Sequence, residues 1–240
     1  KKPENVCVLT WEDSCCREAV ILDQGFENGL DGWTITGLAG NGPVGWSISG
    51  HRKALGAHSL YFGDPQCHTY FNGPLGEDCR PVGGSANTGT LVGGAATSPT
   101  LFLPPLDRQK TVFWVSFNVW LQTEPVQEDV TTQPDLLRLQ VITDSVGEGD
   151  DYPTIFTSAT LDRNTSGHFL HVVGDLSEYT NQTIALRLAF DSFDANSNFF
   201  EGVYVDDFKV ATGCVGEAHP PCETAASSPC GSDGEACTDD

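Results

Sequence analysis

Two groups of carboxylates, far apart in the sequence, lie inside apolar segments of strand-like character. Glu27 is in segment 26–33, and Asp206 and Asp207 are in segment 202–210. A carboxylate among buried strand positions is costly unless a cation or dense hydrogen bonding compensates its desolvation. The pattern predicts that the segments are the first and last strands of one β-sandwich, and that these three carboxylates bind a structural calcium ion. The alternative is that they are exposed at strand ends and bind nothing.

A second group combines aromatic rings with side chains that bind hydroxyl groups. Three alternating runs, 111–121, 136–142 and 184–191, each have one purely apolar face and one mixed face. The mixed faces carry Trp114, Asn118, Trp120, Arg138, Gln140 and Arg187. Aromatic rings stack on sugar rings, and Arg, Asn and Gln bind sugar hydroxyls. If the strands are neighbours in one sheet, these residues form a carbohydrate-binding face. The alternative is that loops cover this face and the two Trp form a second, small core.

The chain contains no pattern typical of a catalytic site. Its six His are scattered, and neither a G-x-S-x-G nor an H-E-x-x-H motif occurs. With 33 acidic residues, some carboxylate pair will lie at a distance suitable for glycoside hydrolysis by chance, so such a pair predicts nothing. We therefore expect a protein that is not an enzyme.

Short strands must position these residues. Apolar runs that alternate with period two are separated by turns, to which 26 Gly and 14 Pro contribute. This composition predicts an all-β domain at 21–214. Residues 1–20 and 215–240 lack apolar periodicity but contain Cys, and we expect them to be a Cys-rich arm and a Cys-rich linker.

The cysteines and the charge restrict compartment and partners. Nine Cys without paired C-x-x-C spacing indicate disulfides, and Cys67 and Cys79, which flank a turn-rich stretch, are predicted to pair. The other pairings stay open. The sequence contains no signal peptide and no membrane span, so we expect a processed piece of an exported, cell-surface protein. A net charge of -21 disfavours binding to nucleic acid or to anionic membranes.

Two acidic loops are further candidates for cation sites. One contains Asp191, Asp194, Asn196 and Asn198, and the other contains Asp144, Glu148, Asp150 and Asp151. Asp and Asn in turns more often bond to their own backbone, so we expect solvated turns here.

The order of several short motifs resembles that of MAM-like domains and of related bacterial jelly-roll modules in secreted and cell-surface proteins. The matching stretches are residues 26–33, Trp46, 56–63, 96–99, the strand through Trp114, 175–177, and 205–214. The resemblance implies a jelly-roll sandwich of two antiparallel sheets, without catalytic activity, used in adhesion or ligand binding. It also implies calcium held by Glu27 and Asp206, then Asp207, with backbone oxygens near Ala57 and His58.

Together these observations predict a calcium-stabilised extracellular module that binds a glycan or a neighbouring surface protein. A first alternative is a structural spacer or a self-assembling subunit whose terminal arms join it to other copies. A second alternative is an accessory domain of a secreted peptidase.

Overall fold

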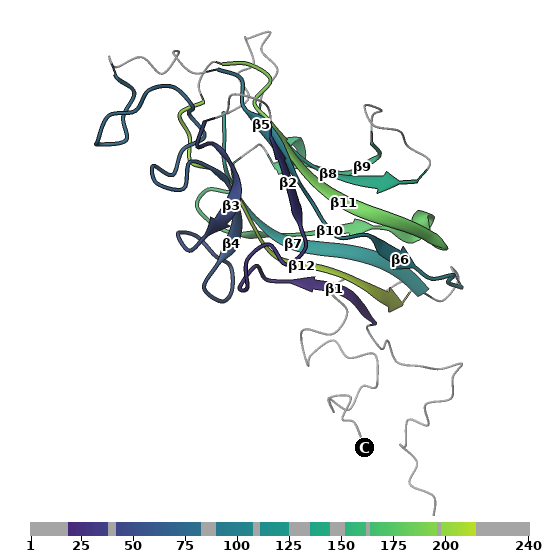
Figure 1. The fold of residues 1–240 in the computed structure, drawn as a ribbon. Helices are drawn as coiled ribbons and strands as arrows, with labels where there is room; N and C mark the ends of the chain where they lie inside the picture. Colours follow the sequence, from purple (N-terminus) through teal and green to yellow (C-terminus); the bar gives the residue numbers. More distant parts are fainter. Residues whose placement is uncertain are drawn as a thin grey trace, which may run out of the picture.

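Alternating apolar residues build two antiparallel sheets whose apolar faces meet in the computed structural model of the 240-residue chain (Figure 1). The structure describes residues 19–37, 42–82, 90–107, 111–124, 135–144, 152–161, 164–195 and 198–214. Nearly all of the predicted arm at 1–20, the predicted linker at 215–240 and their cysteines lie outside these residues. Among the described residues, no helix is both long and apolar enough to cross a bilayer.

Each sheet consists of a path of five strands with a sixth strand paired to one of them. Sheet A runs β10 (Leu170–Asp175), β7 (Thr111–Gln122), β12 (Gly202–Cys214), β4 (Ser59–Gly63) and β3 (Gly45–Ser49), with β1 (Val20–Gln24) paired to β12. Sheet B runs β2 (Thr34–Gly37), β5 (Gly93–Thr97), β11 (Gln182–Asp191), β8 (Leu136–Thr143) and β9 (Thr154–Thr157), with β6 (Leu101–Leu103) paired to β11. Two short 3-10 helices, η2 (Ser158–Leu161) and η3 (Ser177–Tyr179), complete the described elements. The prediction of an all-β jelly-roll sandwich is confirmed.

The first and last strands belong to one sandwich, as predicted, and they pair with each other, but the first strand is not the predicted segment. Strand β1 pairs antiparallel with β12, and the peptide N–H of Thr212 also donates to the carbonyl of Ala19. Residues 26–33 instead form the turns between β1 and β2. Phe26 and Trp33 are buried there and pack edge-to-face, which explains the apolar character that resembled a strand.

The apolar faces predicted from the sequence are the core. Three alternating sets are fully or almost fully buried: Phe113, Val115, Phe117, Val119 and Leu121 of β7; Leu137, Leu139 and Val141 of β8; and Ile184, Leu186, Leu188 and Phe190 of β11. Because side chains alternate across a strand, the mixed faces of these strands point outwards, away from the other sheet. These two outer faces carry the six residues predicted to bind a ligand.

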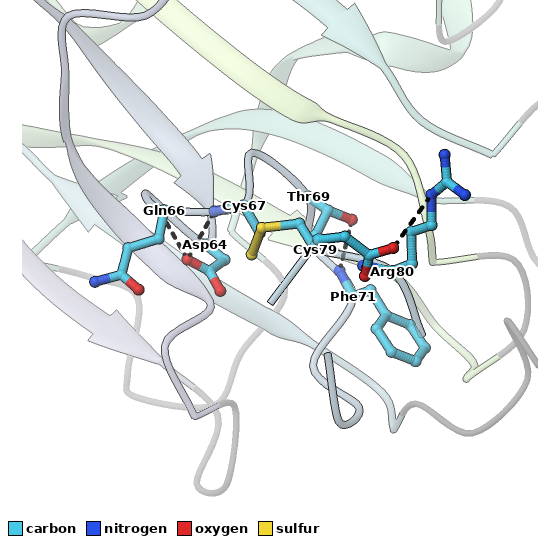
Figure 2. Close-up of a disulfide and its surroundings, with 8 residues drawn as sticks. Asp64, Gln66, Cys67, Thr69, Phe71, Cys79 and Arg80 are labelled. Atoms are coloured by element: carbon cyan, nitrogen blue, oxygen red, sulfur yellow. Dashed lines mark hydrogen bonds and ion pairs between the residues drawn. A yellow bond between two sulfur atoms is a disulfide. The ribbon is translucent and has the colours of Figure 1, made fainter. Parts of the chain in front are cut away.

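The predicted disulfide between Cys67 and Cys79 is confirmed, with Cα atoms 5.3 Å apart (Figure 2). The bond closes a loop after β4. Asp64 stabilises the loop start, since its Oδ1 accepts the peptide N–H of Gln66 at 2.8 Å. Tyr70 and Phe71, between the two cysteines in sequence, are fully buried. The bridge therefore closes a loop that contains two residues of the hydrophobic interior.

Replacing both cysteines of this bridge by Ser should lower the free energy of unfolding by about 2–3 kcal/mol, because the unfolded chain regains the freedom that the closed loop removes. The measurement is urea unfolding of both proteins without reductant, since a reductant would also act on the other cysteines. An unchanged unfolding midpoint would show that the bridge does not contribute to stability.

Candidate functional site

The six residues predicted to form one binding face are divided between the two sheets. Trp114, Asn118 and Trp120 belong to β7 of sheet A, whereas Arg138, Gln140 and Arg187 belong to β8 and β11 of sheet B. The outer faces of the two sheets point to opposite sides of the sandwich. The prediction that all six residues are neighbours is therefore wrong. The error arose because alternation within a strand shows which side chains share a face but not which strands share a sheet.

On the outer face of sheet A, a groove of about 590 Å³ lies beside β7 and β12. Its lining includes Lys53, Leu55, Asn118, His171 and Asp207. Asn118 donates to Oδ2 of Asp207 at 3.1 Å, and its own Oδ1 lies 3.1 Å from Nδ1 of His171. The amide that was predicted to bind a ligand is thus engaged on both sides by protein groups.

The two predicted tryptophans on this face are covered. Trp114 is 1% exposed and Trp120 is 3% exposed. Trp120 packs edge-to-face on Tyr204, which stacks on Tyr61, and the guanidinium of Arg52 lies 4.1 Å from the centroid of the Trp120 ring. For Trp120 this arrangement agrees with the alternative of a second small core, whereas Trp114 lies outside that cluster and lines the groove. A sugar could stack on either indole only if the covering side chains moved.

The outer face of sheet B brings the other three residues together. In the strand register, Thr97, Arg187, Gln140 and Thr154 follow one another across β5, β11, β8 and β9. The next row contains Ala95, Ala189, Arg138 and Thr157. On β2, Thr34 and Thr36 extend these rows by pairing with Thr97 and Ala95. The face is therefore a floor of hydroxyl groups and small side chains from which two arginines project.

Two aromatic residues that the sequence did not single out flank this floor. The Arg138 guanidinium lies 5.0 Å from the ring centroid of Phe193, and that of Arg187 lies 5.6 Å from the ring of Tyr152. A guanidinium N–H of Arg187 also donates to Oε1 of Gln140. Burial lowers the pKa of Arg187, and the like charge of Arg138 lowers it further. Both rings and both guanidinium groups remain partly exposed.

The predicted metal ligand Glu27 lies in the turn after β1 and binds loop 54–58. Its carboxylate accepts the peptide N–H groups of Ala57, at 2.9 and 3.0 Å, and of His58, at 3.1 Å. These bonds lower the pKa of Glu27. Gly56 has φ +59°, and a Cβ there would lie 2.1 Å from Oε1 of Glu27, so the close approach of the carboxylate requires glycine.

Asp206 binds the other part of the same loop from strand β12. Its Oδ2 accepts the peptide N–H of Ala54 at 2.7 Å and of Leu55 at 3.1 Å, and its Oδ1 accepts that of Asp207 at 2.8 Å. Asp206 is 1% exposed, and this burial raises its pKa against the opposing effect of the amide bonds. Asp207, in the β-bulge of β12 with φ +51°, points to the groove on sheet A instead.

The structure thus brings Glu27 and Asp206 to one loop, but it does not present them as an open ligand set for calcium. Each of the four carboxylate oxygens already accepts at least one peptide N–H. Near Ala57 and His58, amide hydrogens rather than carbonyl oxygens face Glu27. Among the described residues, no group of three or more His, Cys, Asp or Glu side chains is placed to hold a metal ion.

Of the two acidic loops, the one after β11 is partly described and bonds to its own backbone. Oδ1 of Asp191 accepts the peptide N–H of Phe193 at 2.8 Å, and Nδ2 of Asn198 donates to the carbonyl of Asp194 at 3.1 Å. These contacts agree with the expected turn. Asn196, Glu148, Asp150 and Asp151 lie outside the described residues.

A buried carboxylate that the sequence analysis missed lies where β7 ends and β8 begins. Asp135 is fully buried, and its Oδ2 accepts the hydroxyl of Tyr70 and the peptide N–H of Glu124. Its Oδ1 is also buried and accepts no hydrogen bond from the described residues. Burial raises the pKa of Asp135 to about 7, and the nearby carboxylate of Glu124 contributes in the same direction.

Comparison with known proteins supports the fold. No protein-family model and no curated protein sequence matches the chain, so the resemblance to MAM-like domains has no support at this level. The chain is similar to the K3 cleaved adhesin domain of Lys-gingipain from Porphyromonas gingivalis, with 14% identity, a TM-score of 0.50, and coverage of 81% of this chain and 98% of that domain.

Two carbohydrate-binding modules give lower structural scores. The CBM22-1 xylan-binding domain of Paenibacillus barcinonensis Xyn10C has 15% identity and a TM-score of 0.42, with coverage of 83% of this chain and 97% of the module. The CBM27-1 module of Caldicellulosiruptor saccharolyticus, solved with mannohexaose, has 12% identity and a TM-score of 0.41, with coverage of 81% and 96%. The similarity that supports the fold is that to the adhesin domain of Lys-gingipain.

Proposed function

We propose that this chain is a non-catalytic extracellular recognition module that binds a glycan on the outer face of sheet B. The observation that carries the proposal is the arrangement of Arg138, Gln140 and Arg187 on neighbouring strands between the rings of Tyr152 and Phe193. Polar groups that converge between rigid aromatic rings are typical of a carbohydrate site, because rings and planar side chains lose little entropy on binding.

The rest of this face suits an extended sugar chain. The rows that contain Arg138, Gln140 and Arg187 also carry Thr and Ala side chains of β2, β5, β11 and β9. Ala95, Ala189 and Gln140 are buried, so the face is open at the two ends of the rows, on β2 and β9. The Thr side chains at 34, 36 and 154 are exposed and can both donate and accept hydrogen bonds. A glycan lying across the strands would meet hydroxyls on the floor and aromatic rings at the borders.

The outer face of sheet A is less suited to this role. Both of its predicted stacking residues, Trp114 and Trp120, are buried, and Asn118 is bonded to Asp207 and faces His171. We therefore assign the ligand to sheet B and keep the groove on sheet A as the comparison in the experiment.

The test is binding of the 240-residue chain to a panel of neutral and acidic polysaccharides, measured by affinity electrophoresis and calorimetry. The double variant Tyr152→Ala, Phe193→Ala should lose at least about tenfold in affinity, since stacking on an aromatic ring contributes about 1 kcal/mol or more. The matched double variant Lys53→Ala, His171→Ala alters the groove on sheet A and should bind like the wild type. Loss of binding only in the sheet A variant would contradict the assignment, and no binding by a folded wild type would contradict the proposal.

Two alternatives from the sequence concern parts of the chain beyond the described residues. A spacer or self-assembling subunit would act through the terminal arms, and deletion of 1–20 or 215–240 would abolish assembly. An accessory domain of a secreted peptidase would belong to the same parent chain as a protease domain. The similarity to the adhesin domain of Lys-gingipain shows a shared fold only. Under either alternative, the Tyr152→Ala, Phe193→Ala variant would leave the function unchanged.

Stabilisation by calcium at Glu27 and Asp206 also stays a proposal. Its support is the concentration of negative charge at loop 54–58, where Glu27 is close enough to raise the pKa of Asp206. Because the peptide N–H groups of this loop occupy the carboxylate oxygens, calcium would have to displace some of these hydrogen bonds.

A further inference from the structure

The arginines in the described part of the chain differ in their partners. Arg52 binds Glu201 through two guanidinium nitrogens, one at 2.7 Å, and Arg80 lies 3.7 Å from a carboxylate oxygen of Asp78. Arg138 and Arg187 have no carboxylate within ion-pair distance among the described residues. In a chain with 33 acidic and 12 basic residues, it is unexpected that two neighbouring arginines have no carboxylate partner within the part of the chain that the structure describes.

These two arginines lie on the proposed binding face and close to each other. Arg187 pairs with Gln140 on β8, and Arg138 pairs with Ala189 on β11, so the two are diagonal neighbours on one side of an antiparallel pair. Tyr152 and Phe193 flank the two arginines, and each guanidinium lies over one of these rings. Two like charges held together in this way are costly unless a third group compensates them.

An anion supplied by the ligand would compensate these two charges. Guanidinium groups bind carboxylates with two parallel hydrogen bonds, and their donors point along a fixed fork. Gln140 accepts one donor of Arg187, which orients that guanidinium and leaves other N–H groups for a ligand. Repulsion from distant acidic residues is screened beyond about 8 Å at physiological ionic strength, so the nearest charges determine the preference.

We propose that the outer face of sheet B recognises an acidic polysaccharide, with the carboxylate of a uronic acid residue bound between Arg138 and Arg187. This inference rests on the proposed glycan-binding function and specifies its ligand class. The flanking rings contact the sugar ring, and the Thr side chains at 97 and 154 lie within the same row to bind its hydroxyls.

The test compares two uronate polymers, polygalacturonate and alginate, each with its own uncharged ester, in calorimetric titrations of the 240-residue chain. We expect at least one uronate polymer to bind at least about tenfold more tightly than its ester, because the ester removes the charge-assisted hydrogen bonds. The Arg138→Gln, Arg187→Gln variant should lose this difference. Arg80→Gln, which changes an exposed arginine outside the face, should keep it.

Other results would overturn the inference. Equal affinity for acid and ester would show that charge is not recognised, and tighter binding of dextran sulfate than of either uronate would assign the arginines to sulfate. If a neutral polysaccharide binds and the Tyr152→Ala, Phe193→Ala variant abolishes that binding, the proposed glycan-binding function is supported but the proposed acidic ligand is wrong. Thermal melts of each variant verify that the fold is retained, so lost binding is assigned to the face.

Discussion

Asp135→Asn is expected to stabilise the protein at pH 8.5 and to flatten the pH dependence of its stability. In the folded protein, burial raises the pKa of Asp135 from its ordinary value of 3.8 to about 7. Between pH 3.8 and about pH 7, Asp135 is therefore protonated in the folded state but ionised in the unfolded state. The stability contributed by protonated Asp135 is complete below about pH 4, declines as the pH rises towards 7, and is absent above that.

The expected magnitude is large. A pKa difference of this size corresponds to on the order of 4 kcal/mol of unfolding free energy between low and high pH, or a change in melting temperature of about 10 °C. Asn keeps an oxygen that can accept the hydroxyl of Tyr70 and the N–H of Glu124, but it carries no charge. The variant should therefore have about the wild-type stability near pH 4, and its advantage should grow as the pH rises to about 7 and then stay constant up to pH 8.5.

The measurement is a series of thermal melts from pH 4.5 to pH 8.5 for the wild type, Asp135→Asn and Asp31→Asn. Asp31 is exposed, so the third protein shows the effect of removing one charge from a strongly acidic surface. Tyr70→Phe provides a second check: the Tyr70 hydroxyl lowers the pKa of Asp135, so its removal should move the loss of stability to higher pH. If the melting temperature depends on pH in the same way for all these proteins, Asp135 does not carry a proton in the folded state.

The fold was predictable because, in a strand, apolar residues at every second position mark the buried face. The apolar sets of β7, β8 and β11 follow from the period of two, and the Cys67–Cys79 bridge follows from its turn-rich loop. Residues 26–33 were misassigned as a strand because Phe26 and Trp33 are buried although they lie in turns. The hydrophobicity of a residue does not show whether it is buried in a strand or in a turn.

The candidate site was only half predictable. Arg138, Gln140 and Arg187 stood out as polar residues on the mixed faces of apolar strands, but Trp114 and Trp120 gave the same signal and are covered by neighbouring side chains. Tyr152 and Phe193 lie just outside β9 and β11, where no periodicity marks them. Their role depends on long-range strand pairing, which joins segments that are distant in sequence. Asp135 was missed for the same reason, since Tyr70 approaches it from another part of the chain.

Asp206→Ala is expected to lower the free energy of unfolding by about 3 kcal/mol or more, whether or not calcium is present. The carboxylate is buried and accepts three peptide N–H groups, those of Ala54, Leu55 and Asp207. Ala would remove these hydrogen bonds to a charged group, each of which contributes about 1.5–3 kcal/mol. The effect should be much larger than that of Glu77→Ala, since Glu77 is exposed.

The same variants separate the amide-binding role of this carboxylate from the proposed calcium site. Urea unfolding of the wild type in calcium and in excess chelator measures the contribution of the ion, and calcium is expected to stabilise the wild type but not Asp206→Ala. If chelator leaves the wild-type midpoint unchanged while Asp206→Ala still unfolds early, the calcium proposal fails and the hydrogen bonds alone account for the buried carboxylate. Glu27 and Asp206 would then stabilise the sandwich by binding loop 54–58 from the turn after β1 and from β12, which explains without a metal why carboxylates occur in these two apolar segments.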